Sequence, residues 1–377
     1  TPQHPWYFDT LRVEEIWEHT TGEGITVAVI DTGVDPTLPE LQGQVLDGID
    51  ISASPQGAHV DSDGHGSNMA SLIAGTGEDG GIRGLAPDAE ILPVRTMIGV
   101  AGEVGPERWA EAIDYAVESG ARVINMSIGG TDNGTASRVM ADALSAAARN
   151  DVLIFAAVGN DGDTFNTRGV PAALDGVVGV AAVDGELERA PYSTHGSQVA
   201  LAGPAEGVPW RCGDLSAPVC LREEGGTSSA SALASASAAL IWSQHPEWTK
   251  NQVLRVMLNT AERPDDQRRD DYTGYGVVRP DRVVIDGEGD PGDPDSPPIF
   301  RDWEAALDPA ATPAPEPEAE TGPADGAEPA PGPEAEAAAT GENSGPLPWI
   351  LGGTAVVLVV AVTGWVVIRR RSASAGA

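Results

Sequence analysis

The sequence is poor in basic residues, and this shortage excludes one class of partner. It has 22 Lys and Arg against 57 Asp and Glu, so the formal net charge is −35. Phosphate binding needs clusters of Lys and Arg, which argues against nucleic acid as a partner. The acidity is not confined to residues 302–342, since that stretch holds only 11 of the acids. The charge favours solubility and steers cationic ligands, but it identifies no activity.

Cysteine is nearly absent, with only Cys212 and Cys220 in the chain. Their short spacing is compatible with two free thiols or with one disulfide. If the chain is exported, a disulfide that pins a loop is the favoured interpretation. The chain begins at Thr1 with no apolar leader, which fits a mature chain whose signal peptide has been removed, although a trimmed sequence would look the same.

Large apolar residues are scarce in residues 287–346, which are rich in Pro, Ala, Gly, Glu and Asp. A segment such as PAPEPEAE cannot bury enough apolar surface to form a core. We therefore expect a disordered acidic, Pro-rich linker over 287–346, which would act as a self-repelling stalk.

Long apolar runs are also rare, with one clear exception at residues 347–368. These 22 residues carry no charge, have Trp349 and Trp365 near their ends, and precede an Arg-Arg-Arg run. The length suits a bilayer and the arginines belong on the cytoplasmic side. A buried core helix is the alternative. We predict one transmembrane helix, a short cytoplasmic tail over 369–377, and an extracellular body anchored to the cell membrane.

In residues 24–286, segments with the pattern of a strand alternate with segments with the pattern of a helix. The run ITVAVI at 25–30 is apolar almost throughout, as expected of a strand buried on both faces. The alternation predicts an α/β fold with a mostly parallel central sheet and helices on both faces. Functional groups then gather at the carboxyl ends of strands. Strands are expected at 25–30, 91–95, 123–127, 152–158 and 177–183, and helices at 106–120 and 138–149.

The stretch GGTSSASALASASAALIWSQHPEW, residues 225–248, crowds serines into a predicted helix. Alanine recurs every four residues from Ala230, which is typical of a closely packed helix face and accounts for the later serines as packing residues. It does not account for the Gly-Gly-Thr-Ser entry. The glycines allow a sharp turn into the helix and leave a backbone N–H free, so Ser228, with Ser229 as its rival, is a candidate nucleophile.

Two further side chains complete a catalytic set. Asp31 follows ITVAVI at the end of a strand, and His65 lies between two glycines at the expected start of a helix. Taken singly, Asp31 is compatible with a turn former and His65 with a structural histidine. Together with Ser228 they supply a nucleophile, a base that removes its proton, and an acid that orients the base.

These residues carry a family resemblance. The segments IDTGVD, DGHGSNMASLIAG, INMSIGG, AAVGND and GTSSASA occur in this order and resemble the subtilisin-like serine proteases over residues 11–284. The resemblance implies a peptidase domain at 24–286, a triad of Asp31, His65 and Ser228, and an oxyanion-hole amide from Asn160. It also implies substrate-binding residues at Ser127, Ile128, Gly129, Gly130, Ala157, Gly159 and Pro171.

Plainer interpretations exist for parts of this set. Asn160 is compatible with a loop residue that caps a strand end, and Ser127 with its glycines is compatible with a tight turn. The sequence also departs from the family, because no Pro follows the Thr-Ser pair and Ser67 and Asn68 follow the histidine. These departures concern helix packing more than the reacting atoms.

The whole architecture resembles the mycosin-like proteases of actinobacteria, which are associated with type VII secretion. Residues 1–23 resemble their N-terminal extension, and Trp6, Tyr7, Leu11 and Trp17 supply apolar surface for packing on the domain. The resemblance implies protein or peptide substrates and the secretion machinery as partners. It implies no cofactor. Many relatives bind calcium, but the acids at 61–63 show no ligand spacing, so we expect no metal site.

Three functions are compatible with these residues. The first is a membrane-tethered endopeptidase that works through an acyl-enzyme outside the cell. The second is a largely structural scaffold of a secretion apparatus that keeps a protease fold. The third is a related acid protease with a Glu base, against which His65 and Asn160 argue.

Overall fold

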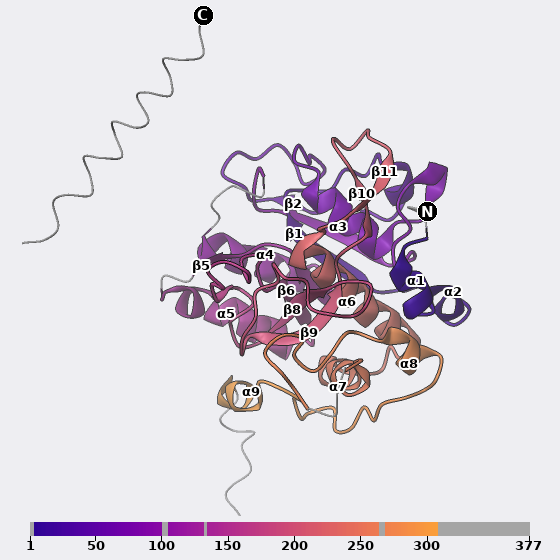
Figure 1. Cartoon of the computed structure of the whole chain (residues 1–377). Coiled ribbons are helices and arrows are strands. Elements are labelled where there is room, and N and C mark those ends of the chain that lie inside the picture. The colour runs from indigo at the N-terminus through magenta and orange to yellow at the C-terminus, as the bar shows by residue number, and fades with distance from the viewer. Residues whose placement is uncertain (1–3, 100–104, 132–133, 264–267, 308–377) are drawn as a thin grey trace, which may run out of the picture. The chain divides into compact units, whose positions relative to one another are not determined.

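A seven-stranded parallel sheet forms the centre of the structure (Figure 1). The computed structural model describes residues 4–99, 105–131, 134–263 and 268–307. Neighbouring strands of the sheet pair in parallel throughout. The order across the sheet is β2 (Ile49–Asp50), β3 (Glu90–Arg95), β1 (Thr26–Asp31), β4 (Val123–Met126), β6 (Leu153–Ala157), β8 (Val177–Val183) and β9 (Val199–Pro204).

Both faces of the sheet are buried because side chains alternate along each strand. In β1, Val27 and Val29 join one core cluster, whereas Ala28 and Ile30 join the other. Helices α3 (His65–Ala74), α6 (Gly226–Gln244) and α7 (Lys250–Thr260) supply the first cluster, and α4 (Pro106–Glu118) and α5 (Ala136–Arg149) the second. The predicted α/β fold, with a mostly parallel sheet and helices on both faces, is confirmed.

The predicted strands and helices occur within a few residues of their expected bounds. Strand β9 was not identified, because a short run of small apolar residues does not separate a buried strand from a buried helix by its period. Two small hairpins lie outside the main sheet, β5 (Gly130–Thr131) with β7 (Gly169–Val170) and β10 (Val208–Arg211) with β11 (Val219–Arg222). The remaining elements are α1 (Trp6–Thr10), α2 (Val13–Ile16), α8 (Pro280–Val284), α9 (Arg301–Leu307), and the 3-10 turns η1 (Pro39–Leu41) and η2 (Glu78–Gly80).

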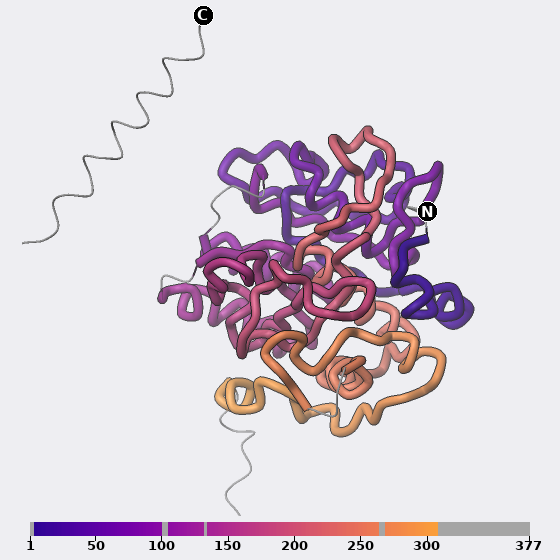
Figure 2. The backbone as a smooth tube through the Cα atoms, in the orientation of Figure 1, coloured from indigo at the N-terminus to yellow at the C-terminus, as the bar shows by residue number. Residues whose placement is uncertain are grey.

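The N-terminal segment is folded against the rest of the chain. Tyr7 and Leu11 are fully buried in the first core cluster. The indole N–H of Trp6 donates to the carbonyl oxygen of Glu206 at 2.7 Å, and that of Trp17 donates to Leu85 at 2.9 Å. In Figure 2 this indigo segment lies beside the orange part of the chain that contains α8, which α2 contacts.

Part of the predicted linker is folded, so its expected start at residue 287 is wrong for residues 287–307. Arg255 donates hydrogen bonds to the carbonyl oxygens of Pro291, Asp293 and Ser296. Trp303 packs against the second core cluster, and Lys250 pairs with a carboxylate of α9. The composition of this Pro-rich stretch predicted disorder. It is ordered instead by hydrogen bonds from Arg255 to its backbone carbonyl oxygens and by the packing of a few apolar side chains.

The rest of the predicted linker (308–346), the predicted transmembrane helix (347–368) and the tail (369–377) lie outside the described residues. Among the helices that the structure does describe, none has the length and apolar character needed to cross a bilayer.

Candidate active site

The structure joins Asp31 to His65. Asp31 is the last residue of β1 and is fully buried, and His65 is the first residue of α3. The imidazole Nδ1 lies 2.7 Å from Oδ1 and 2.9 Å from Oδ2 of the carboxylate. With Nδ1 held by a carboxylate, Nε2 is the nitrogen left to accept a proton.

A second aspartate builds the loop and helix start that carry His65. Asp61 accepts hydrogen bonds from Thr32 Oγ1 at 2.8 Å, from the backbone N–H of Gly64 at 2.8 Å, and from both the backbone and the hydroxyl of Ser67. These bonds tie the end of β1 to the first turn of α3. Asp61 is therefore a positioning residue, and its carboxylate is occupied by donors.

Close approach of α3 to β1 depends on Gly66. A Cβ on this residue would lie 2.2 Å from the carbonyl oxygen of Gly33, which no side chain tolerates. The glycine after His65 thus allows the histidine to reach Asp31.

The carboxylates around His65 control its protonation. Burial by itself lowers the pKa of His65, but the charge and hydrogen bond of Asp31, with smaller contributions from Asp63 and Asp61, raise this pKa above its ordinary value of 6.5. The imidazolium is therefore stabilised, which suits a group that must take up a proton during a reaction.

Ser228 lies in the first turn of α6 and shares a cleft of about 1170 Å³ with His65. Its hydroxyl donates to the carbonyl oxygen of Ser127 at 3.3 Å, and among the described residues it makes no hydrogen bond to the imidazole. The Ser127 hydroxyl donates in return to the Ser228 carbonyl oxygen at 2.9 Å.

The other serines of α6 are structural. The hydroxyl of Ser229, the rival nucleophile, is fully buried and donates to the Gly225 carbonyl oxygen at 2.9 Å. Ser231 and Ser235 donate to Asn125 Oδ1, and Ser237 donates to a carbonyl within the helix. Of the serines in α6, Ser228 is the one that lines the cleft.

Asn160 faces the same cleft after β6. Its Oδ1 accepts hydrogen bonds from the backbone N–H of Thr227 at 2.8 Å and from the Thr227 hydroxyl at 3.0 Å. These two bonds fix the orientation of the amide, so Nδ2 is the donor that remains for a ligand in the cleft. Thr227, which the sequence reasoning did not single out, is the residue that sets this orientation.

Most of the predicted substrate-binding residues line the cleft: Ser127, Ile128, Gly129, Gly130, Ala157 and Gly159. Pro171 does not, although its neighbour Val170 does. The strand expected at 123–127 ends one residue early, at Met126, and Gly130 pairs with Val170 in a separate two-stranded ladder.

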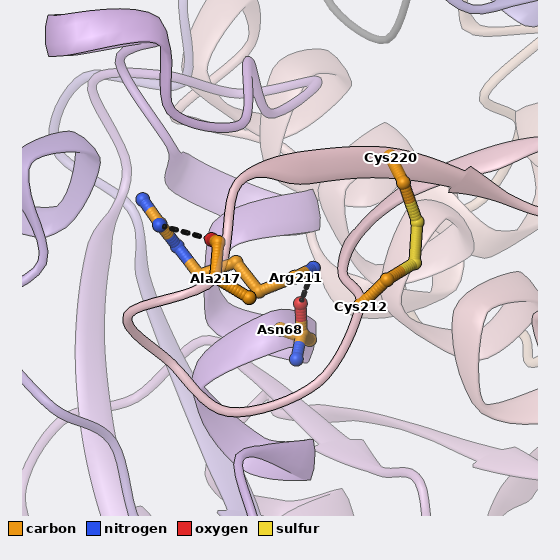
Figure 3. Close-up of a disulfide and its surroundings, with 5 residues drawn as sticks. All are labelled: Asn68, Arg211, Cys212, Ala217 and Cys220. Atoms are coloured by element: carbon orange, nitrogen blue, oxygen red, sulfur yellow. Dashed lines mark hydrogen bonds between the residues drawn. A yellow bond between two sulfur atoms is a disulfide. The ribbon is translucent and has the colours of Figure 1, made fainter.

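The hairpin β10–β11 borders the site. Cys212 and Cys220 form a disulfide, the second of the two alternatives that the sequence left open, and the backbone N–H of Arg211 donates to Asn68 Oδ1 of α3 at 2.8 Å (Figure 3). Trp210 contacts the His65 ring edge to face, with centroids 6.0 Å apart. The cross-linked hairpin is therefore tied to the helix that presents His65.

The profile of the Subtilase family matches residues 22–276, which cover more than half of the chain. The chain belongs to the subtilase family. Subtilisin E of Bacillus subtilis is 32% identical over 246 residues, which is 64% of this chain and 61% of that protein. The major intracellular serine protease of the same organism is 33% identical over 205 residues, or 52% of this chain and 63% of that protein. This subtilase thus spans about three fifths of the length of these relatives.

Solved structures extend the similarity. MycP1 of Mycobacterium smegmatis superposes with a TM-score of 0.65 at 25% identity and covers 78% of this chain and 87% of its own. The MycP3 protease of the type VII (ESX-3) secretion system superposes with a TM-score of 0.64 at 29% identity, over 76% and 88% of the two chains. The resemblance of this subtilase to the mycosin-like proteases is confirmed.

Among the described residues, no group of three or more His, Cys, Asp or Glu side chains is placed to hold a metal ion. The expected absence of a metal site stays a prediction. Sequence reasoning missed the residues that position the site, Asp61, Thr227 and Trp210. For Asp61 a signal was present, since an aspartate shortly before a predicted helix start is a common cap.

Proposed function

We propose that this subtilase is a serine endopeptidase, tethered to the membrane and facing the outside of the cell, with Asp31, His65 and Ser228 as its triad. One observation carries the proposal: the carboxylate of Asp31 holds Nδ1 of His65 at 2.7 Å in the cleft that Ser228 lines. The similarity to other subtilases supports it, and so does Asn160, whose amide lines the same cleft.

In the proposed reaction, His65 Nε2 takes the proton of Ser228 as Oγ attacks the carbonyl carbon of the substrate. We propose that Oγ leaves the Ser127 carbonyl and turns to the imidazole when substrate binds, since catalytic hydrogen bonds often tighten only in the substrate complex. The imidazolium, stabilised by Asp31, then gives the proton to the leaving amine as the C–N bond breaks. Water hydrolyses the acyl-enzyme by the same proton transfers in reverse.

The negative charge on the tetrahedral intermediate needs donors. The amide Nδ2 of Asn160 and the backbone N–H at the start of α6 are proposed to bind this oxygen. Glycines around Ser127 leave room for the substrate side chain, and an extended peptide pairs with the backbone there.

The tether and the cellular role are proposed on separate grounds. The charge-free segment 347–368 and the arginines after it support an anchor with the C-terminus in the cytoplasm. Similarity to MycP1 and MycP3, which belong to type VII secretion systems, supports a role in protein secretion.

A fluorophosphonate probe tests the proposed chemistry. Such probes phosphonylate a serine only when a base activates it, so we expect a single adduct on Ser228 when the labelled chain is digested and sequenced by mass spectrometry. An adduct on Ser229, or no adduct on Ser228 at neutral pH, would contradict the proposal.

Replacing Asn160 by Ala is expected to lower kcat by about 10²–10³-fold with little change in KM, because the lost donor acts mainly in the transition state. The magnitude comes from subtilisin, a relative in this family. Peptide hydrolysis by N160A measures it. Since Asn160 Oδ1 also accepts the two hydrogen bonds from Thr227, N160D serves as the matched variant. It keeps that acceptor, loses the Nδ2 donor and adds a negative charge beside the developing oxyanion, so it should lose at least as much activity as N160A.

A further inference from the structure

An arginine at the cleft is held in place by an aromatic ring. Arg222 is the last residue of β11, is exposed, and lines the cleft that contains His65 and Ser228. Its guanidinium carbon lies 4.5 Å from the centroid of the Trp210 ring. This stacking orients the planar guanidinium at modest entropic cost.

The hairpin itself is rigidly held. Arg222 pairs with Val208 across the β10–β11 ladder, and the Cys212–Cys220 disulfide closes the other end. The same hairpin is tied to α3 through Arg211 and Asn68 (Figure 3). Arg222 is therefore displayed from a cross-linked support and not from a loose loop.

Arg222 has no carboxylate partner among the described residues. Other arginines of this acidic chain do: Arg95 pairs with Asp50 at 2.7 Å, and Arg211 pairs with Glu40 at 2.5 Å. An arginine that is oriented but unpaired, in a cleft, is free to bind an incoming carboxylate through its forked N–H groups.

A second donor lines the same cleft. The hydroxyl oxygen of Tyr192 accepts a hydrogen bond from the backbone N–H of Gly226 at 3.3 Å and keeps its own hydrogen for donation. Burial, together with Glu206 and Glu224, raises the pKa of Tyr192 to about 12 against the opposing effects of Gly226 and Arg222, so the hydroxyl stays protonated at neutral pH.

Acidic groups also face the cleft. Asp161 lines it, but Thr167 and Thr194 donate hydrogen bonds to its carboxylate. Glu224 lines it too, two residues from Arg222. Because of this neighbour and the net charge of −35, an acidic peptide gains nothing from the general field of the protein. Any preference for an acidic residue must come from a local contact.

We propose that Arg222 and Tyr192 bind a carboxylate side chain of the substrate, so that this subtilase prefers peptides with Asp or Glu at one position near the scissile bond. The inference rests on the proposed peptidase function. Figure 1 shows the β10–β11 hairpin near the top and β5 at the left, and Arg222 and Gly130 both line the cleft that contains His65.

Paired fluorogenic peptides test the preference with the full chain. The peptides carry Glu or Gln at each position in turn around the cleaved bond and have amidated C-termini, which removes a terminal carboxylate as the source of binding. At one position we expect kcat/KM to be about 10-fold higher for Glu than for Gln, since a hydrogen bond to a charged group contributes roughly that much. The ratio should fall as salt is added.

The variant R222Q should bring the Glu/Gln ratio to about 1. R301Q is the matched control, since it removes the same charge from an exposed arginine of α9 outside the cleft, and it should keep the wild-type ratio. A ratio near 1 at all positions in the wild type, or an unchanged ratio in R222Q, overturns the inference while peptide cleavage continues. Failure to cleave any peptide, together with no fluorophosphonate adduct, overturns the proposed function instead.

Discussion

Replacing Ser228 by Ala is expected to lower kcat for peptide hydrolysis by about 10⁶-fold, which is the magnitude that loss of the serine causes in the relative subtilisin. The effect is this large because the variant loses the oxygen that forms the acyl-enzyme, and no other serine of α6 lines the cleft. Hydrolysis of a fluorogenic peptide at neutral pH measures it, with a thermal unfolding curve to show that the variant is folded.

The neighbouring serine provides the control for this change. S229A deletes the same atom one residue away, where the hydroxyl donates to Gly225 inside the helix. We expect S229A to keep hydrolysis within a few-fold of the wild type and to lose a little stability. If S228A keeps its activity, or if S229A loses as much as S228A, the assignment of the nucleophile is wrong.

The same variant separates catalysis from a scaffold role. A chain that acts mainly as a structural part of a secretion apparatus would support secretion as S228A, although it hydrolyses nothing. A chain whose peptidase activity matters would not.

The substitution Asp31→Asn is expected to lower kcat by about 10⁴-fold at neutral pH, as in serine proteases that lose the carboxylate of the triad. The asparagine keeps the size of the side chain but removes the charge that stabilises the imidazolium of His65. It also fails to hold the tautomer in which Nε2 accepts a proton.

The pH dependence of kcat/KM gives a second test of the role of Asp31, because the direction in which its acid limb moves can be predicted. In the wild type, hydrolysis needs neutral His65, so kcat/KM should fall as the pH drops through a His65 pKa that lies above 6.5. D31N removes the main group that raises this pKa, and the acid limb should move to lower pH. D63N is the matched control, because Asp63 contributes a smaller interaction in the same direction. An acid limb that stays in place in D31N would contradict the role of Asp31.

Some expectations depended on composition and were only partly right. The composition of residues 287–307 is typical of a disordered segment, yet Arg255 donates hydrogen bonds to their carbonyl oxygens and Trp303 packs on the core. The composition of a segment indicates how much apolar surface it can bury, but it does not show which residues from other parts of the chain will contact it. The ladder of Gly130 with Val170 was not predicted for a similar reason, since this pairing is a long-range contact.

Local patterns in the amino-acid sequence were enough to predict the class of fold and the catalytic candidates. Apolar runs with turn signals between them specify strands buried on both faces, and the functional residues stand at strand ends and helix starts, where short-range patterns are informative. The folded arrangement was needed to show which serine faces the cleft, how Asn160 is oriented by Thr227, and that Trp210 and Arg222 border the site from a cross-linked hairpin. These facts depend on side chains that lie far apart along the chain and meet only after folding, and local patterns carry no record of such contacts.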